Sequence, residues 1–248
     1  QDSVVVCDLS LLKDTVDLPF SFFLKDFQII KLDNRDEAMV GENNLCVSEN
    51  YILVYGSVYE LHPCRLFTKK GEFVTNIGAI GQGPGEYRAV YKAEIDEKHN
   101  CIYLMPFANS NAIYVYDLAG KPLRSIPLHQ SVSKAVFKVD ADKRELTVGA
   151  LPFTGYPFVA WVQDFEGHLL NSVPAARHLS VLPDYSNEVM YGANTEVFDF
   201  YISTFFELRP DTLYHYIRSG SRLKPRFTLN IGDRKRSITT FYELPQPM

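Results

Sequence analysis

A repeated unit built around a glycine turn is the strongest constraint on how this 248-residue chain folds. Three segments align on Gly71, Gly120 and Gly167, which are 49 and 47 residues apart. A fourth copy, Asp211–Gly220, aligns without a gap with Asn111–Gly120, and two tyrosines and the glycine coincide. Self-similarity at a period of this length predicts a series of similar small structural units.

Each copy predicts β-strands on both sides of its glycine. Apolar runs come before the glycine segment at Tyr51–Tyr55, Cys101–Met105 and Glu145–Val148, and short runs follow it at Phe73–Ile77, Leu123–Ile126 and Phe227–Ile231. Because glycine adopts positive φ without steric cost, each glycine is expected to join two strands in a tight hairpin. No long run has apolar residues at helical spacing, and aromatic residues, at 13%, favour pleated structure.

We therefore predict an all-β fold, a β-propeller of four-stranded blades with about four to five blades in this chain. Residues 1–248 would form a single β-propeller domain, with repeat units at 42–79, 90–128, 133–173 and 188–232. A leading strand is expected at Phe27–Leu32. One four-stranded sheet cannot bury both of its apolar faces alone, whereas sheets packed around an axis can. A β-sandwich is the alternative, but it does not require a repeat.

Composition narrows the classes of partner. The net charge of −5 and the pI near 5.7 argue against a nucleic-acid binder, which needs a basic face. No apolar run is long enough to span a membrane as a helix. Cys46, Cys64 and Cys101 lie in or beside apolar runs, so buried free thiols are favoured over disulfides. The start at Gln1 indicates a removed leader and hence export, although a trimmed start would look the same.

Two segments carry a family resemblance. Gly78–Tyr87 resembles the G-x-GQGPGEY segment of the six-bladed β-propeller family of Bacteroides-type exported lipoproteins, which are similar to NHL-repeat propellers. Asp211–Tyr214, followed by Leu223–Gly232, resembles a blade of the same family. The resemblance implies a propeller, export to the periplasm or outer-membrane surface, and lipid anchoring through a cysteine upstream of Gln1. It implies no activity.

The chain departs from that family in length, because members are usually longer. The ring is therefore smaller, or C-terminal blades are missing, or an open arc of an incomplete six-bladed ring is completed by a partner. An open arc would expose a sheet face and a strand edge, which predicts self-association.

The glycine-rich segment is the predicted ligand-binding site. A phosphate-binding loop would need a following helix, whereas Pro84 interrupts the segment and another strand follows. As a connection between blades, the loop is expected on one face of the ring near its axis, where propellers bind ligands. The predicted ligand-binding residues are Gln82, Glu86, Tyr87 and Arg88.

Catalytic and metal-binding patterns are weak. The six histidines form no H-x-x-x-H and no histidine–acid pair at ligand spacing, and there is no G-x-S-x-G, so neither a metal site nor a cofactor is predicted. Asp140–Glu145 indicates a β-turn rather than a calcium loop. The basic residues between Arg218 and Arg236 indicate a charged outer strand and tail rather than an anion site.

The predicted function is that of an exported, non-enzymatic β-propeller that binds a ligand, a protein or a glycan. The alternative is a metal-dependent hydrolase or lyase of the NHL or lactonase-like propeller type, with Glu94, Asp96 and Glu188 as candidate acids. No catalytic residue is assigned.

Overall fold

The computed structural model is all-β. It describes residues 4–14, 16–41, 43–56, 62–176, 179–192, 197–205, 210–230 and 241. Helical structure within these ranges is limited to four single 3-10 turns, η1 (Leu9–Leu11), η2 (Phe20–Phe22), η3 (Asp36–Ala38) and η4 (Arg218–Gly220). In this part of the chain, no helix has the length and apolar character needed to cross a bilayer.

Most strands belong to four antiparallel sheets in which consecutive strands are neighbours. The first sheet contains β2 (Asn43–Val47), β3 (Tyr51–Gly56), β4 (Cys64–Thr68) and β5 (Phe73–Ile77). The second contains β8 (Val90–Asp96), β9 (Cys101–Pro106), β10 (Ser110–Tyr116) and β11 (Ile126–Val132). The third contains β12 (Ala135–Asp140), β13 (Glu145–Ala150), β14 (Phe158–Asp164) and β15 (Leu169–Pro174). The fourth contains β16 (Glu188–Tyr191), β17 (Asp199–Ser203), β18 (Asp211–Ile217) and β19 (Arg222–Asn230).

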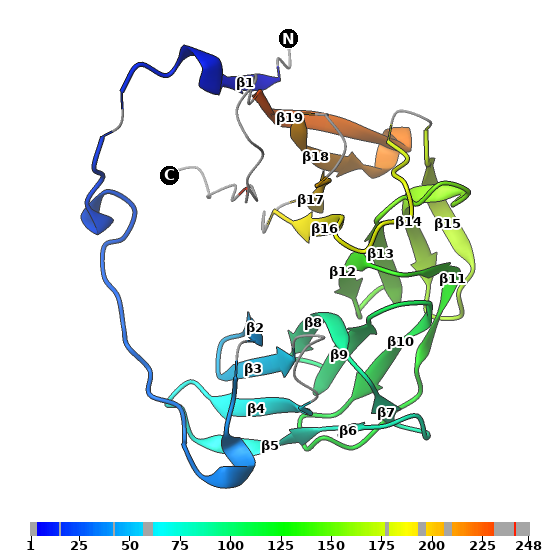
Figure 1. Ribbon diagram of the computed structural model, residues 1–248. Coiled ribbons are helices and arrows are strands. Elements are labelled where there is room, and N and C mark those ends of the chain that lie inside the picture. Colours follow the sequence, from blue (N-terminus) through cyan, green and yellow to red (C-terminus); the bar gives the residue numbers. More distant parts are fainter. Residues whose placement is uncertain are drawn as a thin grey trace.

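The four sheets follow one another along an open arc (Figure 1). The first strand of each sheet lies on the inside of the arc, and β8 contacts β2 on one side and β12 on the other, while β12 also contacts β16. Strands β5, β11, β15 and β19 lie on the outside. Consecutive units therefore meet mainly through their inner strands and sheet faces.

Each pair of neighbouring sheets shares an apolar core. Leu66 of the first sheet packs with Leu104 of the second, and Ile113 of the second packs with Trp161 of the third. Val162 of the third sheet packs with Phe200 of the fourth. All these side chains are almost fully buried, as expected where a two-faced sheet is covered on both sides.

The two ends of the chain cover the first and the fourth sheet, which are the two end sheets of the arc. Ile30 and Leu32 pack against Phe67 on the free face of the first sheet, and Phe241 packs against Tyr201 in the fourth. Strand β1 (Val5–Asp8) pairs in parallel with β19 and so covers its edge. Between β1 and the first sheet, the chain crosses the opening of the arc (Figure 1). Self-association through an open edge stays a prediction.

This region corrects one expectation about the fold. The strand predicted at Phe27–Leu32 is wrong, because these residues form no strand; Ile30 and Leu32 lie on the face of the first sheet, whereas Phe27 and Ile29 are exposed. The N-terminal strand is β1, which the sequence analysis did not predict.

The predicted glycine turns are confirmed in three copies. Gly71, Gly120 and Gly167 have φ of 89°, 83° and 90°, and each precedes the last strand of its sheet. In the fourth copy the predicted hairpin is also confirmed, because β18 and β19 pair antiparallel around Gly220, but η4 ends at Gly220 and the left-handed residue is Ser221, with φ 46°. The 3-10 turn moves the positive-φ position one residue along the chain.

The predicted strands agree with the structure at Tyr51–Tyr55, Cys101–Met105, Glu145–Val148 and Phe73–Ile77. The strand at Leu123–Ile126 is wrong, since β11 begins only at Ile126. Pro122 cannot donate to a ladder, and it makes one isolated bridge to Tyr116 before the chain moves on. All four cysteines are free, and only Cys64 is fully buried.

Candidate functional site

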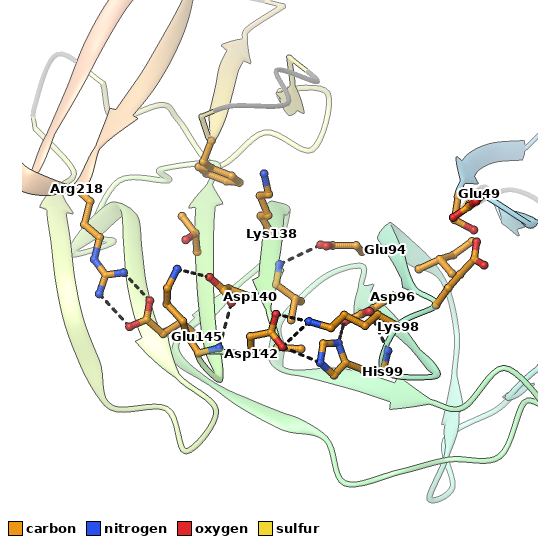
Figure 2. Close-up of a pocket in the computed structure, with 18 residues that line it drawn as sticks. Glu49, Glu94, Asp96, Lys98, His99, Lys138, Asp140, Asp142, Glu145 and Arg218 are labelled. Atoms are coloured by element: carbon orange, nitrogen blue, oxygen red, sulfur yellow. Dashed lines mark hydrogen bonds and ion pairs between the residues drawn. The ribbon is translucent and has the colours of Figure 1, made fainter.

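Turns from neighbouring sheets surround a pocket of about 630 Å³ (Figure 2). The turn after β2, the turn after β8 and the turn after β12 form most of its wall, and Phe198 and Arg218 of the fourth sheet complete it. Its charged lining consists of Glu49, Glu94, Asp96, Glu97, Lys98, His99, Lys138, Asp140, Asp142, Lys143, Glu145 and Arg218. Residues from all four sheets therefore form the pocket.

Asp142 joins the turns of the second and third sheets. Its carboxylate accepts hydrogen bonds from the Lys98 ammonium at 2.6 and 2.8 Å and lies 3.2 Å from Nε2 of His99. The other ring nitrogen of His99 lies 2.7 Å from Asp96. The Lys98 ammonium, and to a lesser degree His99, hold the pKa of Asp142 below its usual value.

Other charged groups along the turns are also paired. Arg218 donates to both oxygens of Glu145, at 2.5 and 3.0 Å, and these bonds lower the pKa of that carboxyl. Lys143 binds Asp140 at 2.6 Å, and Glu97 accepts from the backbone and side-chain amides of Asn50. Each sheet is therefore connected to the next by a polar contact at this end.

Glu94 and Lys138 differ from these paired groups. Glu94 accepts a hydrogen bond of 3.1 Å from the backbone N–H of Val139, and burial raises its pKa to about 7. Lys138 sits opposite Thr147 in the β12–β13 ladder. Among the described residues, the Lys138 ammonium has no hydrogen-bond or ion-pair partner. Figure 2 shows both side chains apart from the row of ion pairs along the turns.

The structure places the four predicted ligand-binding residues outside this pocket. Gln82 and Arg88 are exposed, and Glu86 accepts a hydrogen bond of 2.8 Å from the backbone N–H of Gly83. Tyr87 is buried: its hydroxyl donates to the carbonyl of Ile77 and accepts from the amide of Cys64. These bonds give Glu86 and Tyr87 local structural roles, and ligand binding at this loop stays a prediction.

The position of that loop corrects another expectation. Its short parallel strands β6 (Ala79–Ile80) and β7 (Glu86–Tyr87) lie toward the outer edge of the arc, not near its centre (Figure 1). Gly85 packs against Pro122 and accepts a hydrogen bond from Tyr116, both next to the outer strand of the second sheet. A second cavity of about 380 Å³ lies there, and Glu86 is the one predicted residue in its lining.

The candidate acids of the hydrolase alternative do not come together. Glu94 and Asp96 line the large pocket, whereas Glu188 binds Lys134 at the other end of the inner strands. Among the described residues, no group of three or more His, Cys, Asp or Glu side chains could hold a metal ion. No observation in this part of the chain favours the metal-dependent alternative.

Two histidine–acid pairs contradict the sequence analysis. His99 pairs with Asp96 and His168 with Asp164, at spacings of three and four residues along the chain. A search for short acid–histidine spacings in turns would have found both. The sequence analysis also did not name Lys138 as a candidate site residue. The signal that could have found it is a charged residue near the end of an otherwise apolar strand.

The remaining motif predictions have mixed outcomes. Asp140–Glu145 contains the predicted turn between β12 and β13. Arg218 of the basic stretch is paired with Glu145. His178, together with Arg234, Lys235 and Arg236, lies outside the described residues.

A comparison with family models identifies what the chain is related to. The model of a domain of unknown function, DUF4934, matches residues 4–245. The chain belongs to this family. The family description carries no activity, and none of the curated proteins matches the sequence.

A solved structure of an exported-type protein shares the fold of this DUF4934 chain. A crystal structure of a "Putative exported protein" from Bacteroides fragilis NCTC 9343 matches with a TM-score of 0.60 and 18% identity. The match covers 92% of this chain and 60% of the other, so this chain spans less than two thirds of that relative. The dihydro-heme d1 dehydrogenase NirN matches with a TM-score of 0.37 and 13% identity, over 76% of this chain and 39% of the other. A TM-score this low does not define a shared fold.

Proposed function

We propose that this DUF4934 chain is an exported β-propeller and that its four sheets are blades of one domain. The meandering order of each sheet, with the first strand inside and the last outside, supports this proposal. The shared fold of the Bacteroides protein supports export, since that protein is named as exported. The resemblance in the glycine loop further supports lipid anchoring at a cysteine upstream of Gln1. Fractionation of cells that make the full protein tests both points: recovery in the cytoplasm would contradict them.

The proposed molecular function is non-enzymatic ligand binding at the pocket of Figure 2. The observation that carries it is a cavity of about 630 Å³ walled by turns of successive sheets. A volume of this size accommodates a small molecule, and its polar groups can fix the orientation of that molecule. Because the pocket needs several units, binding would depend on the assembled arc rather than on a single repeat.

A thermal-shift panel tests this function. The chain is heated with a neutral hexose, a hexuronate, L-leucine and a nucleoside monophosphate, each over a range of concentrations. We expect at least one compound to raise the melting temperature in a saturable way. Thr147→Trp, which places a large ring in the pocket, should abolish the shift. Val74→Trp, at an exposed position of β5 outside the pocket, is the control and should preserve the shift.

The control pair makes the test decisive. A shift that survives Thr147→Trp would show that the compound binds elsewhere, and the absence of any shift across the panel would also count against a small-molecule pocket.

A further inference from the structure

The pocket contains a cation, Lys138, and an acid, Glu94, that form no direct ion pair among the described residues, although the charges of Lys138 and Lys92 act on Glu94 from a greater distance. Lys98, Lys143 and Arg218 each have an acidic partner in the pocket wall. Within the described residues, Lys138 and Glu94 form no ion pair. Both are partly buried, where an uncompensated charge costs more than in open water. A ligand of opposite charge would therefore gain from contact with each.

The two groups are close enough in the fold to act on one molecule. Glu94 is on β8, and its carboxylate binds the backbone N–H of Val139, the residue after Lys138 on β12. Figure 2 shows both side chains on the same side of the pocket, away from the ion pairs of the turns. The positive and negative groups thus lie on adjacent inner strands and face a shared space.

The charge of the surroundings argues against a purely anionic ligand. Seven carboxylates line the pocket against four Lys or Arg side chains and one histidine, so a multiply charged anion is repelled. A molecule with one carboxylate and one ammonium meets no such penalty, since Lys138 binds the first and Glu94 the second. Thr147, opposite Lys138, adds a hydroxyl, and the Phe198 ring provides an apolar wall.

We infer that this pocket binds a small zwitterion, a free α-amino acid, with its carboxylate at Lys138 and its ammonium at Glu94. The inference rests on the proposed ligand-binding function and names the class of ligand.

The ionisation of Glu94 supports the same assignment. Burial raises its pKa to about 7, and Lys138 from β12, Asp96 and Lys92 from its own strand, and Tyr191 from β16 also surround it. A bound ammonium favours the ionised carboxylate. Affinity for an amino acid should therefore rise between pH 6 and pH 8, while the ammonium of the ligand stays charged.

Isothermal titration with L-leucine and two blocked analogues tests the inference. L-Leucinamide lacks the carboxylate and N-acetyl-L-leucine lacks the ammonium. We expect L-leucine to bind and each analogue to bind at least about tenfold more weakly. Lys138→Met should weaken the binding of L-leucine by a similar factor without further weakening the binding of L-leucinamide. Glu94→Gln should weaken the binding of L-leucine without further weakening the binding of N-acetyl-L-leucine.

Lys70→Met is the matched control, because Lys70 is exposed in the turn after β4 and does not line the pocket. It should leave the affinity for L-leucine within about twofold. Equal binding of all three leucine compounds would overturn the inference. Binding of a hexose, hexuronate or nucleotide that Thr147→Trp abolishes, without binding of L-leucine, would overturn the amino-acid assignment and leave the proposed function standing. No binding by any compound would overturn both.

Discussion

The inner strands β8, β12 and β16 have two ends that are built in different ways. At the end where β12 and β16 begin, the Lys134 ammonium is buried, with 3% of its side chain exposed. It donates to the carbonyls of Tyr185 and Asn187, at 2.6 and 2.9 Å, and to the carboxylate of Glu188 at 2.5 Å. At the turn end, the charges of the pocket wall form ion pairs that are largely exposed, such as Lys98 with Asp142.

The difference separates a buried contact that stabilises the packing of the sheets from exposed ion pairs at the pocket where we propose ligand binding. The Glu188 carboxylate also lies 2.7 Å from the hydroxyl of Tyr91, so the buried group joins the second, third and fourth sheets. A buried charge that loses its partner is strongly destabilising, whereas an exposed pair is worth little. The first end can therefore hold the units together while the turn end keeps charged groups available to a ligand.

Lys134→Met is expected to have the largest effect on stability. The change keeps most of the side-chain volume but removes the donor to two carbonyls and one donor to the Glu188 carboxylate, which is 36% exposed, so it should cost about 2–3 kcal/mol. Urea unfolding followed by the fluorescence of the single tryptophan, the buried Trp161, measures it. Lys98→Met, at the exposed pair, should leave the midpoint almost unchanged. Equal effects of the two variants would contradict the distinction between the two ends.

Gly120 and Gly220, which occupy equivalent hairpin turns of the second and fourth sheets, allow a second comparison of stability. A Cβ at Gly120 would lie 2.3 Å from the carbonyl oxygen of Asn76 in the first sheet, and φ there is +83°. At Gly220, the nearest atoms to an added Cβ are 3.5 Å away and belong to the flexible Arg222 side chain. Gly120→Ala should therefore destabilise the chain by at least about 2 kcal/mol. Gly220→Ala should change stability by less than about 0.5 kcal/mol.

Thermal melting of the two alanine variants side by side decides this point. If both melt like the parent chain, the contact between the turn of the second sheet and the edge of the first contributes nothing to stability.

The smallest expected effect concerns pH. The pKa of Glu94 in the folded chain, about 7, lies above the ordinary value of 4.5, so the folded state holds this proton more tightly than the unfolded state. Its contribution to stability is fully present below pH 4.5 and is lost as the pH rises through 7. Glu94→Gln should not show this loss. The free energy of unfolding of the variant, relative to that of the parent chain, should therefore be higher at pH 8 than at pH 5 by on the order of 2 kcal/mol. Melting curves at both pH values test it; an unchanged pH profile would mean that Glu94 ionises normally.

The elements were easier to predict than the site. The glycine turns at Gly71, Gly120 and Gly167 were predictable because positive φ is a local requirement that glycine meets. Gly220 has the same sequence context, yet a 3-10 turn passes the left-handed position to Ser221. Phe27–Leu32 has an apolar pattern like that of a strand, but it forms none, and only Ile30 and Leu32 pack on the free face of the first sheet. Local pattern does not say which apolar surface a segment will meet.

The sequence by itself determined most of the β-strands and hairpins and the repeated units, because backbone preferences and apolar alternation act over a few residues. Only the tertiary structure decided that Asp142 meets Lys98, that Lys134 is buried beside Glu188, and that Lys138 and Glu94 face one pocket. Each of these pairs brings together residues from different sheets, more than 40 positions apart in the sequence. Their formation depends on how the sheets pack along the arc, and that packing is set by cores shared between units rather than by any local stretch of sequence.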